Sequence, residues 1–149
     1  GDIAALGNCI NLQKTIFSQC DEITGDIAAL GNCTNLKFAD FGCSGVGGDI
    51  AVLRNSTNLE SVNFNNCYEI TGDMSALGNC TNLKYANFDD CEITGDIVAL
   101  ESCTNLENVD FTRYFSASDI TGDIVALGKC INLQKAIFNQ CAEITGDIA

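Results

Sequence analysis

One short phrase, Gly-Asp followed by Ile or Met, recurs along the whole chain and constrains its fold more than any other feature. The aspartates of this phrase stand at 2, 26, 49, 73, 96, 123 and 147, so the spacings are 24, 23, 24, 23, 27 and 24 residues. A fixed period of this length is the signature of a repeat architecture, in which one small unit stacks on copies of itself. The sequence therefore predicts a single array over residues 1–149, with repeats at 1–24, 25–47, 48–71, 72–94, 95–121 and 122–145 and a partial repeat at 146–149.

Each repeat carries one strand signal and one turn signal. Within a unit, a Leu is followed by a small or branched residue and then by a Phe two positions further on, as at Leu12, Thr15 and Phe17. This alternation is typical of a short strand with one buried face, and a unit so short can bury that face only against its neighbours. The strands should then run parallel, one in each rung. The Asp-Ile-x-x-Leu-Gly phrase predicts a short helical or 3₁₀ turn on the opposite side, with Asp as its N-cap, and the Thr-Gly pair before it is a turn signal.

These columns resemble the leucine-rich repeat. The run Cys9-x-x-Leu12-x-x-Thr15-x-Phe17-x-x-Cys20-x-x-Ile23-Thr24 is similar to the cysteine-containing class of that family, whereas the Thr24-Gly25-Asp26-Ile27 link resembles the turn of plant-type repeats. The chain departs from the family by using a small residue and then Phe at two core positions where Leu is usual. The resemblance implies an α/β repeat: a right-handed solenoid with a parallel β-sheet on its concave face and short helical or 3₁₀ turns on the other side. It implies no particular activity, because such arrays serve many unrelated roles.

Composition excludes several classes of function. Seven Lys and Arg against twenty Asp and Glu give a net charge of −13, and this field repels phosphate backbones and anionic lipids. We therefore expect no nucleic-acid partner and no membrane insertion. The chain has no His, which removes Ser-His and Cys-His pairs and imidazole metal ligands. Asp89 and Asp90 are adjacent, and in a strand they would point to opposite sides, so they do not make a catalytic pair. We expect no enzyme activity and no cofactor.

The ten cysteines follow the repeat and not a pairing scheme. Five of them (9, 33, 80, 103 and 130) share a column that Ser56 interrupts, and four others (20, 67, 91 and 141) share a second column, in which Cys43 has slipped by one residue and Tyr114 stands in the fifth repeat. The favoured interpretation is two ladders of buried free thiols, because free Cys behaves as a small hydrophobe. Disulfides within a column and a metal or Fe–S site remain alternatives. Reduced thiols would favour an intracellular compartment, but a secreted protein is not excluded.

Two other patterns admit both a structural and a functional interpretation. The seven stacked aspartates could bind cations, but one Asp in each rung is few ligands for calcium, and each can cap its own turn. Three Asn-x-Ser/Thr matches begin at Asn32, Asn55 and Asn79, and each is also the ordinary repeat phrase at its position. We interpret the aspartates as caps and the glycosylation signals as incidental.

The best candidate for a working surface is the open face of the sheet. Outward strand positions vary from rung to rung while the core columns stay constant, and two of the varying residues, Phe38 and Tyr85, are aromatic. This pattern predicts a non-catalytic protein-interaction module whose partner is a protein with a basic or polar surface. The predicted partner-binding residues are Phe38, Asp40, Asn63, Tyr85, Asn87, Asp89, Asp110, Arg113 and Tyr114. The last two belong to the three-residue insertion of the long repeat, which should bulge from the stack at residues 113–119.

A structural or assembly role is the alternative. Residues 1–24 and 122–145 differ only at the pairs Ala4/Val125, Asn8/Lys129, Thr15/Ala136, Ser18/Asn139 and Asp21/Ala142. This likeness indicates a higher-order period of five repeats, as in a longer array that serves as a scaffold. Both ends of the sequence cut a repeat, so we expect the terminal cores to be covered by further repeats or by another subunit.

Overall fold

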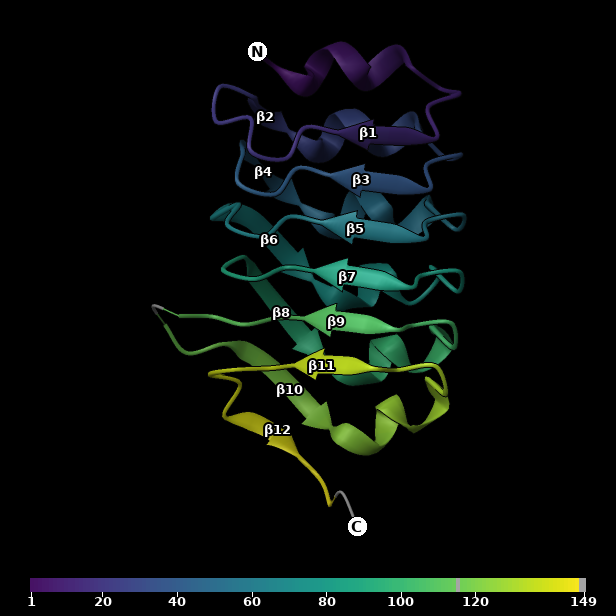
Figure 1. The fold of residues 1–149 in the computed structure, drawn as a ribbon, viewed down its shortest axis with the longest axis vertical. Coiled ribbons are helices and arrows are strands. Elements are labelled where there is room, and N and C mark those ends of the chain that lie inside the picture. The colour runs from purple at the N-terminus through teal and green to yellow at the C-terminus, as the bar shows by residue number, and fades with distance from the viewer. Residues whose placement is uncertain (115, 148–149) are drawn as a thin grey trace.

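The computed structural model describes residues 1–114 and 116–147 and shows a stack of similar rungs (Figure 1). Each full rung has a short strand, a second strand and a 3₁₀ helix, in agreement with the repeat period. The first strands pair in parallel into a six-stranded sheet in the order β1-β3-β5-β7-β9-β11. These strands are β1 (Lys14–Ile16), β3 (Phe38–Asp40), β5 (Ser61–Asn63), β7 (Tyr85–Asn87), β9 (Asn108–Asp110) and β11 (Lys135–Ile137).

A second parallel sheet of six strands, in the order β12-β10-β8-β6-β4-β2, lies behind the first (Figure 1). Its strands are β2 (Thr24–Asp26), β4 (Gly45–Asp49), β6 (Glu69–Asp73), β8 (Glu92–Asp96), β10 (Asp119–Asp123) and β12 (Glu143–Thr145). The prediction that Thr-Gly forms a turn was therefore wrong. The phrase lies inside a strand because equivalent phrases on neighbouring rungs supply its pairing partners, as Thr71 pairs with Glu92.

The predicted short turn is a 3₁₀ helix in every complete repeat. The helices are η1 (Ile3–Asn8), η2 (Ile27–Asn32), η3 (Ile50–Asn55), η4 (Met74–Leu77), η5 (Ile97–Ser102) and η6 (Ile124–Lys129). The Asp before each helix accepts a hydrogen bond from the backbone N–H two residues on; Asp73 Oδ1, for example, accepts from Ser75 at 2.8 Å. The prediction that Asp is the N-cap is thus confirmed for the six helices. In the described part of the chain, no helix is long and apolar enough to cross a membrane.

The core between the two sheets is continuous along the stack. Its most regular feature is the column of Phe side chains, whose neighbouring ring centroids lie 5.3 to 5.8 Å apart from Phe17 to Phe138. Phe41, Phe64, Phe88 and Phe111 are almost completely buried. In the first and last rungs Phe17 and Phe138 are only partly buried, and Ala136 is exposed although its counterpart Ala86 is buried. The packing of each rung therefore depends on its neighbours.

The cysteines only partly follow the prediction. All ten have free thiols, and seven are buried, but Cys9 is exposed and Cys20 and Cys43 are half-buried. The prediction that all are buried was wrong for these three. Cys9 and Cys20 lie in the first rung, where the core is covered from one side only, and Cys43 has slipped out of its column into a left-handed conformation with φ of 57°.

The buried thiols link adjacent rungs. Cys67 Sγ donates to the Phe41 carbonyl at 3.0 Å and Cys91 Sγ donates to the Phe64 carbonyl at 3.1 Å. Burial raises the pKa of Cys80 to about 11 and that of Cys103 to about 12, so both thiols stay neutral near pH 7.

The insertion in the long repeat does not interrupt either sheet. β9 pairs with both β7 and β11, and β10 pairs with both β8 and β12, so the extra residues do not break the ladders, as predicted. The predicted bounds of the bulge, 113–119, were wrong at the end, because Ser118 is buried and Asp119 begins β10. Phe115 of this segment lies outside the described residues. The prediction that Tyr114 stands in the second cysteine column was wrong: Ser118 is the buried residue there, and its Oγ accepts from the Ile120 N–H at 3.3 Å.

Candidate protein-binding face

The outer face of the first sheet, which we call the open face, consists of columns that run across the strands. Parallel pairing aligns Phe38 with Ser61 and then Tyr85, and aligns Asp40 with Asn63 and then Asn87. Between these two columns, the middle residue of each strand points inward, as the buried Ala39, Val62 and Ala86 show. The alternation of inward and outward positions is therefore the one that the sequence predicts. Seven of the nine predicted binding residues lie on this face or at its margin: Phe38, Asp40, Asn63, Tyr85, Asn87, Asp89 and Asp110.

Two aromatic rings stand on the open face, two rungs apart. Phe38 is 37% exposed and Tyr85 is 36% exposed, so each ring offers part of its surface to a partner and rests the remainder on the sheet. Lys14 Nζ lies 5.6 Å from the centroid of the Phe38 ring, a distance at which a cation is attracted to an aromatic face. Asn87 Nδ2 donates to the Tyr85 hydroxyl at 3.1 Å and holds that ring in place.

The polar column beside the aromatic residues has a structural role that the sequence did not reveal. Asp40, Asn63, Asn87 and Asp110 each use Oδ1 to accept the backbone N–H two residues on, at 2.9 to 3.2 Å. These bonds stabilise the turn that follows each strand. Asp40 Oδ1 also accepts from Asn63 Nδ2 at 2.9 Å. The column is therefore pre-ordered, and a partner would meet its remaining polar atoms.

Asp89 is the carboxylate on this face with the least favourable surroundings. Asp89 and Asp90 both follow β7, and neither lies inside a strand. Asp90 has a left-handed φ of 58°. The expectation that both residues lie in a strand was wrong. Burial raises the pKa of Asp89, and the nearby carboxylates of Asp110 and Asp90 raise it further, against a smaller opposing effect of Lys135. Within the described residues, Asp89 Oδ1 is buried and accepts no hydrogen bond.

The other two predicted binding residues lie apart from the open face. Arg113 Nη2 is 3.8 Å from Glu92 Oε1, so its side chain is directed toward the second sheet. Tyr114 is 64% exposed, and its backbone N–H donates to Asp90 Oδ1 at 2.9 Å. The insertion therefore forms an edge of the molecule next to the second sheet, and the structure does not bring Arg113 and Tyr114 together with Phe38 and Tyr85.

The open face holds few converging side chains and a small hollow. Over residues 1–114 and 116–147, no three Cys, Asp or Glu side chains converge as a metal site would require. The hollow beside Tyr85 has a volume of about 20 Å³, and Lys135 Nζ lies 3.9 Å from Asp110 Oδ2 at its rim. A space of this size holds about one water molecule and not a substrate.

Three solved structures with the same fold show which class of protein the architecture defines. The internalin inlF of Listeria monocytogenes has a TM-score of 0.66 at 23% identity, over 97% of this chain and 37% of that one. The leucine-rich-repeat ectodomain of the receptor kinase SOBIR1 of Arabidopsis thaliana has a TM-score of 0.69 at 16% identity, over 88% of this chain and 71% of that one. The ectodomain of GASSHO1/SCHENGEN3, also from Arabidopsis thaliana, has a TM-score of 0.70 at 19% identity, over 96% of this chain and 17% of that one.

The chain is thus a leucine-rich-repeat solenoid, and the fold that the sequence predicts is confirmed. It spans only 37% of the internalin and 17% of the GASSHO1/SCHENGEN3 ectodomain. No family model matches the chain, and no curated protein matches its sequence.

Proposed function

We propose that this chain is a non-catalytic protein-binding module and that the open face of its first sheet is the working surface. The observation that carries the proposal is the presence of Phe38 and Tyr85, both partly exposed, beside a polar column that is already ordered in the four central strands. Aromatic side chains in such a setting supply most of the energy of many protein interfaces. The GASSHO1/SCHENGEN3 ectodomain was solved in complex with CASPARIAN STRIP INTEGRITY FACTOR 2, which is a precedent for a partner bound to this fold.

The acidic balance favours a partner with a basic or polar surface. The net charge is −13, and three carboxylates lie where strands of the open face end: Asp40 and Asp110 close β3 and β9, and Asp89 follows β7. Complementary charge raises the rate of encounter and selects among partners more than it adds affinity. Arg113 and Tyr114 would take part only where a partner reaches around the edge at the insertion. We also propose, from the second sheet that the Thr-Gly-Asp phrase builds, that the link between units is of the plant type.

The test is to capture binding proteins with the wild-type chain and then to compare single variants. We expect Phe38→Ala and Tyr85→Ala to weaken binding by about 2 kcal/mol or more each, the usual effect of truncating an aromatic anchor. Ile131→Ala is the matched control because Ile131 is exposed and lies outside the open face, after η6. Lys129→Ala tests the turn side. Loss of binding in these controls, with unchanged binding for Phe38→Ala and Tyr85→Ala, would move the site to the helical side.

The second candidate function is a scaffold built from a longer array. It is supported by the near-identity of residues 1–24 and 122–145. On this hypothesis further repeats or another subunit would cover the terminal cores. Sedimentation velocity over a range of concentrations tests it: reversible end-to-end growth supports a scaffold, and a constant monomer favours the binding module.

A further inference from the structure

The second sheet has one rung that differs from the others. Most of its central strands begin with an acidic residue and carry a Thr two positions later, as Glu69 and Thr71 do in β6. In β4 these two positions are Gly45 and Gly47. Parallel pairing brings Gly47 next to Glu69 and Gly45 next to Thr24. The outer surface of β4 therefore lacks the side chains that cover the other rungs.

This gap forms a groove along β4. Two open hollows, of about 460 Å³ and about 520 Å³, share Gly45 in their floor. Asp21 and Tyr68 border the first hollow, and Asp26 and Glu69 border the second. Gly45 is exposed and Gly47 is half-buried, with the Cβ of Glu69 close to Gly47, so a ligand reaches the backbone most directly at Gly45. We call these residues and the glycine floor the β4 groove.

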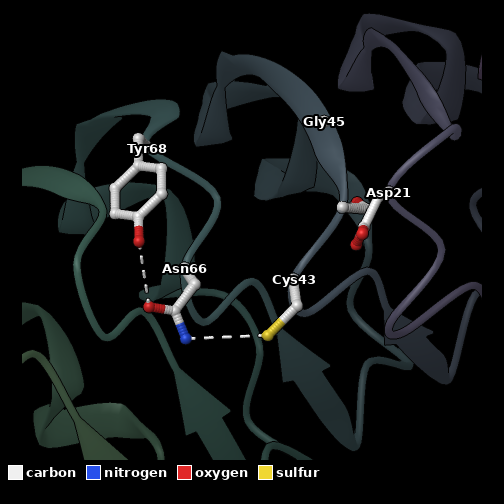
Figure 2. A pocket seen from close by; sticks show the side chains of 6 residues that line it. Asp21, Cys43, Gly45, Asn66 and Tyr68 are labelled. Carbon is white, nitrogen blue, oxygen red and sulfur yellow. Dashed lines mark hydrogen bonds between the residues drawn. The ribbon is translucent and has the colours of Figure 1, made fainter.

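One wall of the groove is fixed by a chain of hydrogen bonds. The Tyr68 hydroxyl donates to Asn66 Oδ1 at 3.3 Å, and Asn66 Nδ2 donates to Cys43 Sγ at 3.6 Å. Figure 2 shows this chain on one side of the hollow and the Asp21 carboxylate on the other, with Gly45 between them. The Tyr68 ring is 60% exposed although its hydroxyl is held, so an aromatic surface is presented to the solvent.

The charge of the groove is uncompensated. In the parts of the chain that the structure describes, the acidic partners in salt bridges are Glu60, Glu92, Glu101 and Asp110, and none of these borders the groove. Within the described residues, Asp21, Asp26 and Glu69 therefore have no Lys or Arg within salt-bridge distance. Asp26 Oδ1 also accepts the Ala28 N–H at 2.7 Å, which leaves Asp21 and Glu69 as the free carboxylates.

We propose that the β4 groove binds the cationic side chain of an Arg or Lys in an extended segment of a partner protein. An aromatic face beside carboxylates is the arrangement that attracts a guanidinium or ammonium group, and Arg in particular stacks on a Tyr ring while it pairs with a carboxylate. The two hollows meet at Gly45 and together follow the chain from Cys43 to Gly48, a length that favours a peptide over a small free cation. This site lies on the second sheet and is independent of the open face of the first sheet.

The experiment uses three probes in NMR titrations of the ¹⁵N-labelled chain: a short Gly/Ser peptide with one central Arg, the same peptide with neutral citrulline in place of Arg, and free ethylguanidinium. We expect the Arg peptide to shift the backbone amides of Gly45, Gly47 and Gly48 in a saturable way. The shifts should weaken at high salt, because exposed charges are screened. The citrulline peptide should leave these amides unchanged.

Variants assign the contacts. Tyr68→Leu, Asp21→Asn and Glu69→Gln should each weaken the Arg peptide about threefold, the size expected for an exposed cation–π contact or ion pair. The matched controls are Tyr114→Leu, a similarly exposed Tyr, and Glu143→Gln, at the first position of β12. The double variant Phe38→Ala/Tyr85→Ala should leave the peptide-induced shifts of the groove amides unchanged. The proposal for the open face and the proposal for the groove can therefore fail independently.

Four outcomes would overturn the proposal. Equal binding of the citrulline peptide would show that charge is not recognised. Shifts confined to amides of the first sheet would place the peptide elsewhere. Ethylguanidinium that binds as tightly as the Arg peptide would assign the groove to free cations. Calcium chloride that moves the same glycine amides at lower concentration would make it a metal site.

Discussion

Gly72 lies so close to Asp49 of the preceding rung that a Cβ atom built on it would stand 2.2 Å from Asp49 Oδ1. Its φ of +118° is also a conformation that residues with a side chain rarely adopt. The same pair recurs along the second sheet, as at Gly25 with Asp2 and Gly122 with Asp96. The Gly-Asp phrase that reveals the repeat thus records a contact between rungs: the Asp that caps one helix occupies the space above the next glycine.

We expect Gly72→Ala to lower the free energy of unfolding by at least about 2 kcal/mol, because the methyl group adds steric overlap to an unfavourable backbone conformation. Urea denaturation followed by circular dichroism measures the change. Gly128→Ala is the matched control, since a Cβ at Gly128 meets nothing within 4 Å and its φ is not positive. Equal destabilisation by the two substitutions would contradict the inter-rung contact.

The helix caps should make stability depend on acid pH. The backbone N–H of Ser75 holds the pKa of Asp73 below its usual value. A carboxyl group whose pKa is lower in the folded state stabilises the fold above its unfolded pKa of about 3.9, and this contribution is lost as the pH falls through the folded pKa. We expect Asp73→Ala to cost about 1 kcal/mol near pH 7, the usual value of an N-cap, and less in acid. Asp73→Asn should retain most of the cap, so a loss equal to that of Asp73→Ala would argue against it.

Thiol reactivity should divide the ten cysteines into two groups. Cys9, Cys20 and Cys43 are accessible, whereas the other seven are buried and burial raises their pKa values. We expect about three thiols to react with Ellman's reagent in the folded protein and all ten after unfolding, because only an accessible thiolate is nucleophilic. Mass spectrometry of the labelled chain identifies which three react. Fewer than ten thiols after unfolding without reductant would reveal a disulfide.

The sequence predicted the features that a single rung determines and missed those that arise between rungs. The parallel strand around Thr15, the Asp caps and the Phe column all follow from the alternation and spacing within one unit. The second sheet was missed because Glu69-Ile70-Thr71-Gly72-Asp73 holds one apolar residue, so its strand signal is weak until neighbouring rungs pair with it. The β4 groove was missed for a similar reason: the effect of Gly45 and Gly47 depends on the side chains of the adjacent rungs, which one unit does not show.

On the open face, the sequence predicted which residues share a column and could not show which of them are already engaged. The Asx bonds of Asp40 and Asn87 depend on the turn after each strand, and that turn was expected to be strand. The salt bridge between Arg113 and Glu92 forms because Glu92 lies in the second sheet, which the sequence did not predict. Phe38, Tyr85 and Asp89 are therefore the stronger candidates for contact with a partner than the polar column or Arg113.

The last prediction concerns Asp89, whose carboxylate we expect to lower the stability of the fold. Burial and the carboxylates of Asp110 and Asp90 raise its pKa, and its buried Oδ1 accepts no hydrogen bond within the described residues. A carboxyl group with a raised folded pKa lowers stability above that pKa, and the penalty disappears as the pH falls toward the unfolded value of about 3.9. We therefore expect Asp89→Asn to raise the urea midpoint near pH 7 and to have little effect in acid.

A residue retained at a cost in stability is typical of a functional site, because a bound cation would remove the penalty. The same variant should then weaken binding of a basic partner to the open face, while Asp119→Asn, an exposed carboxylate on the second sheet, should change neither quantity. A lower urea midpoint for Asp89→Asn, with binding unchanged, would show that Asp89 serves the fold and not the partner.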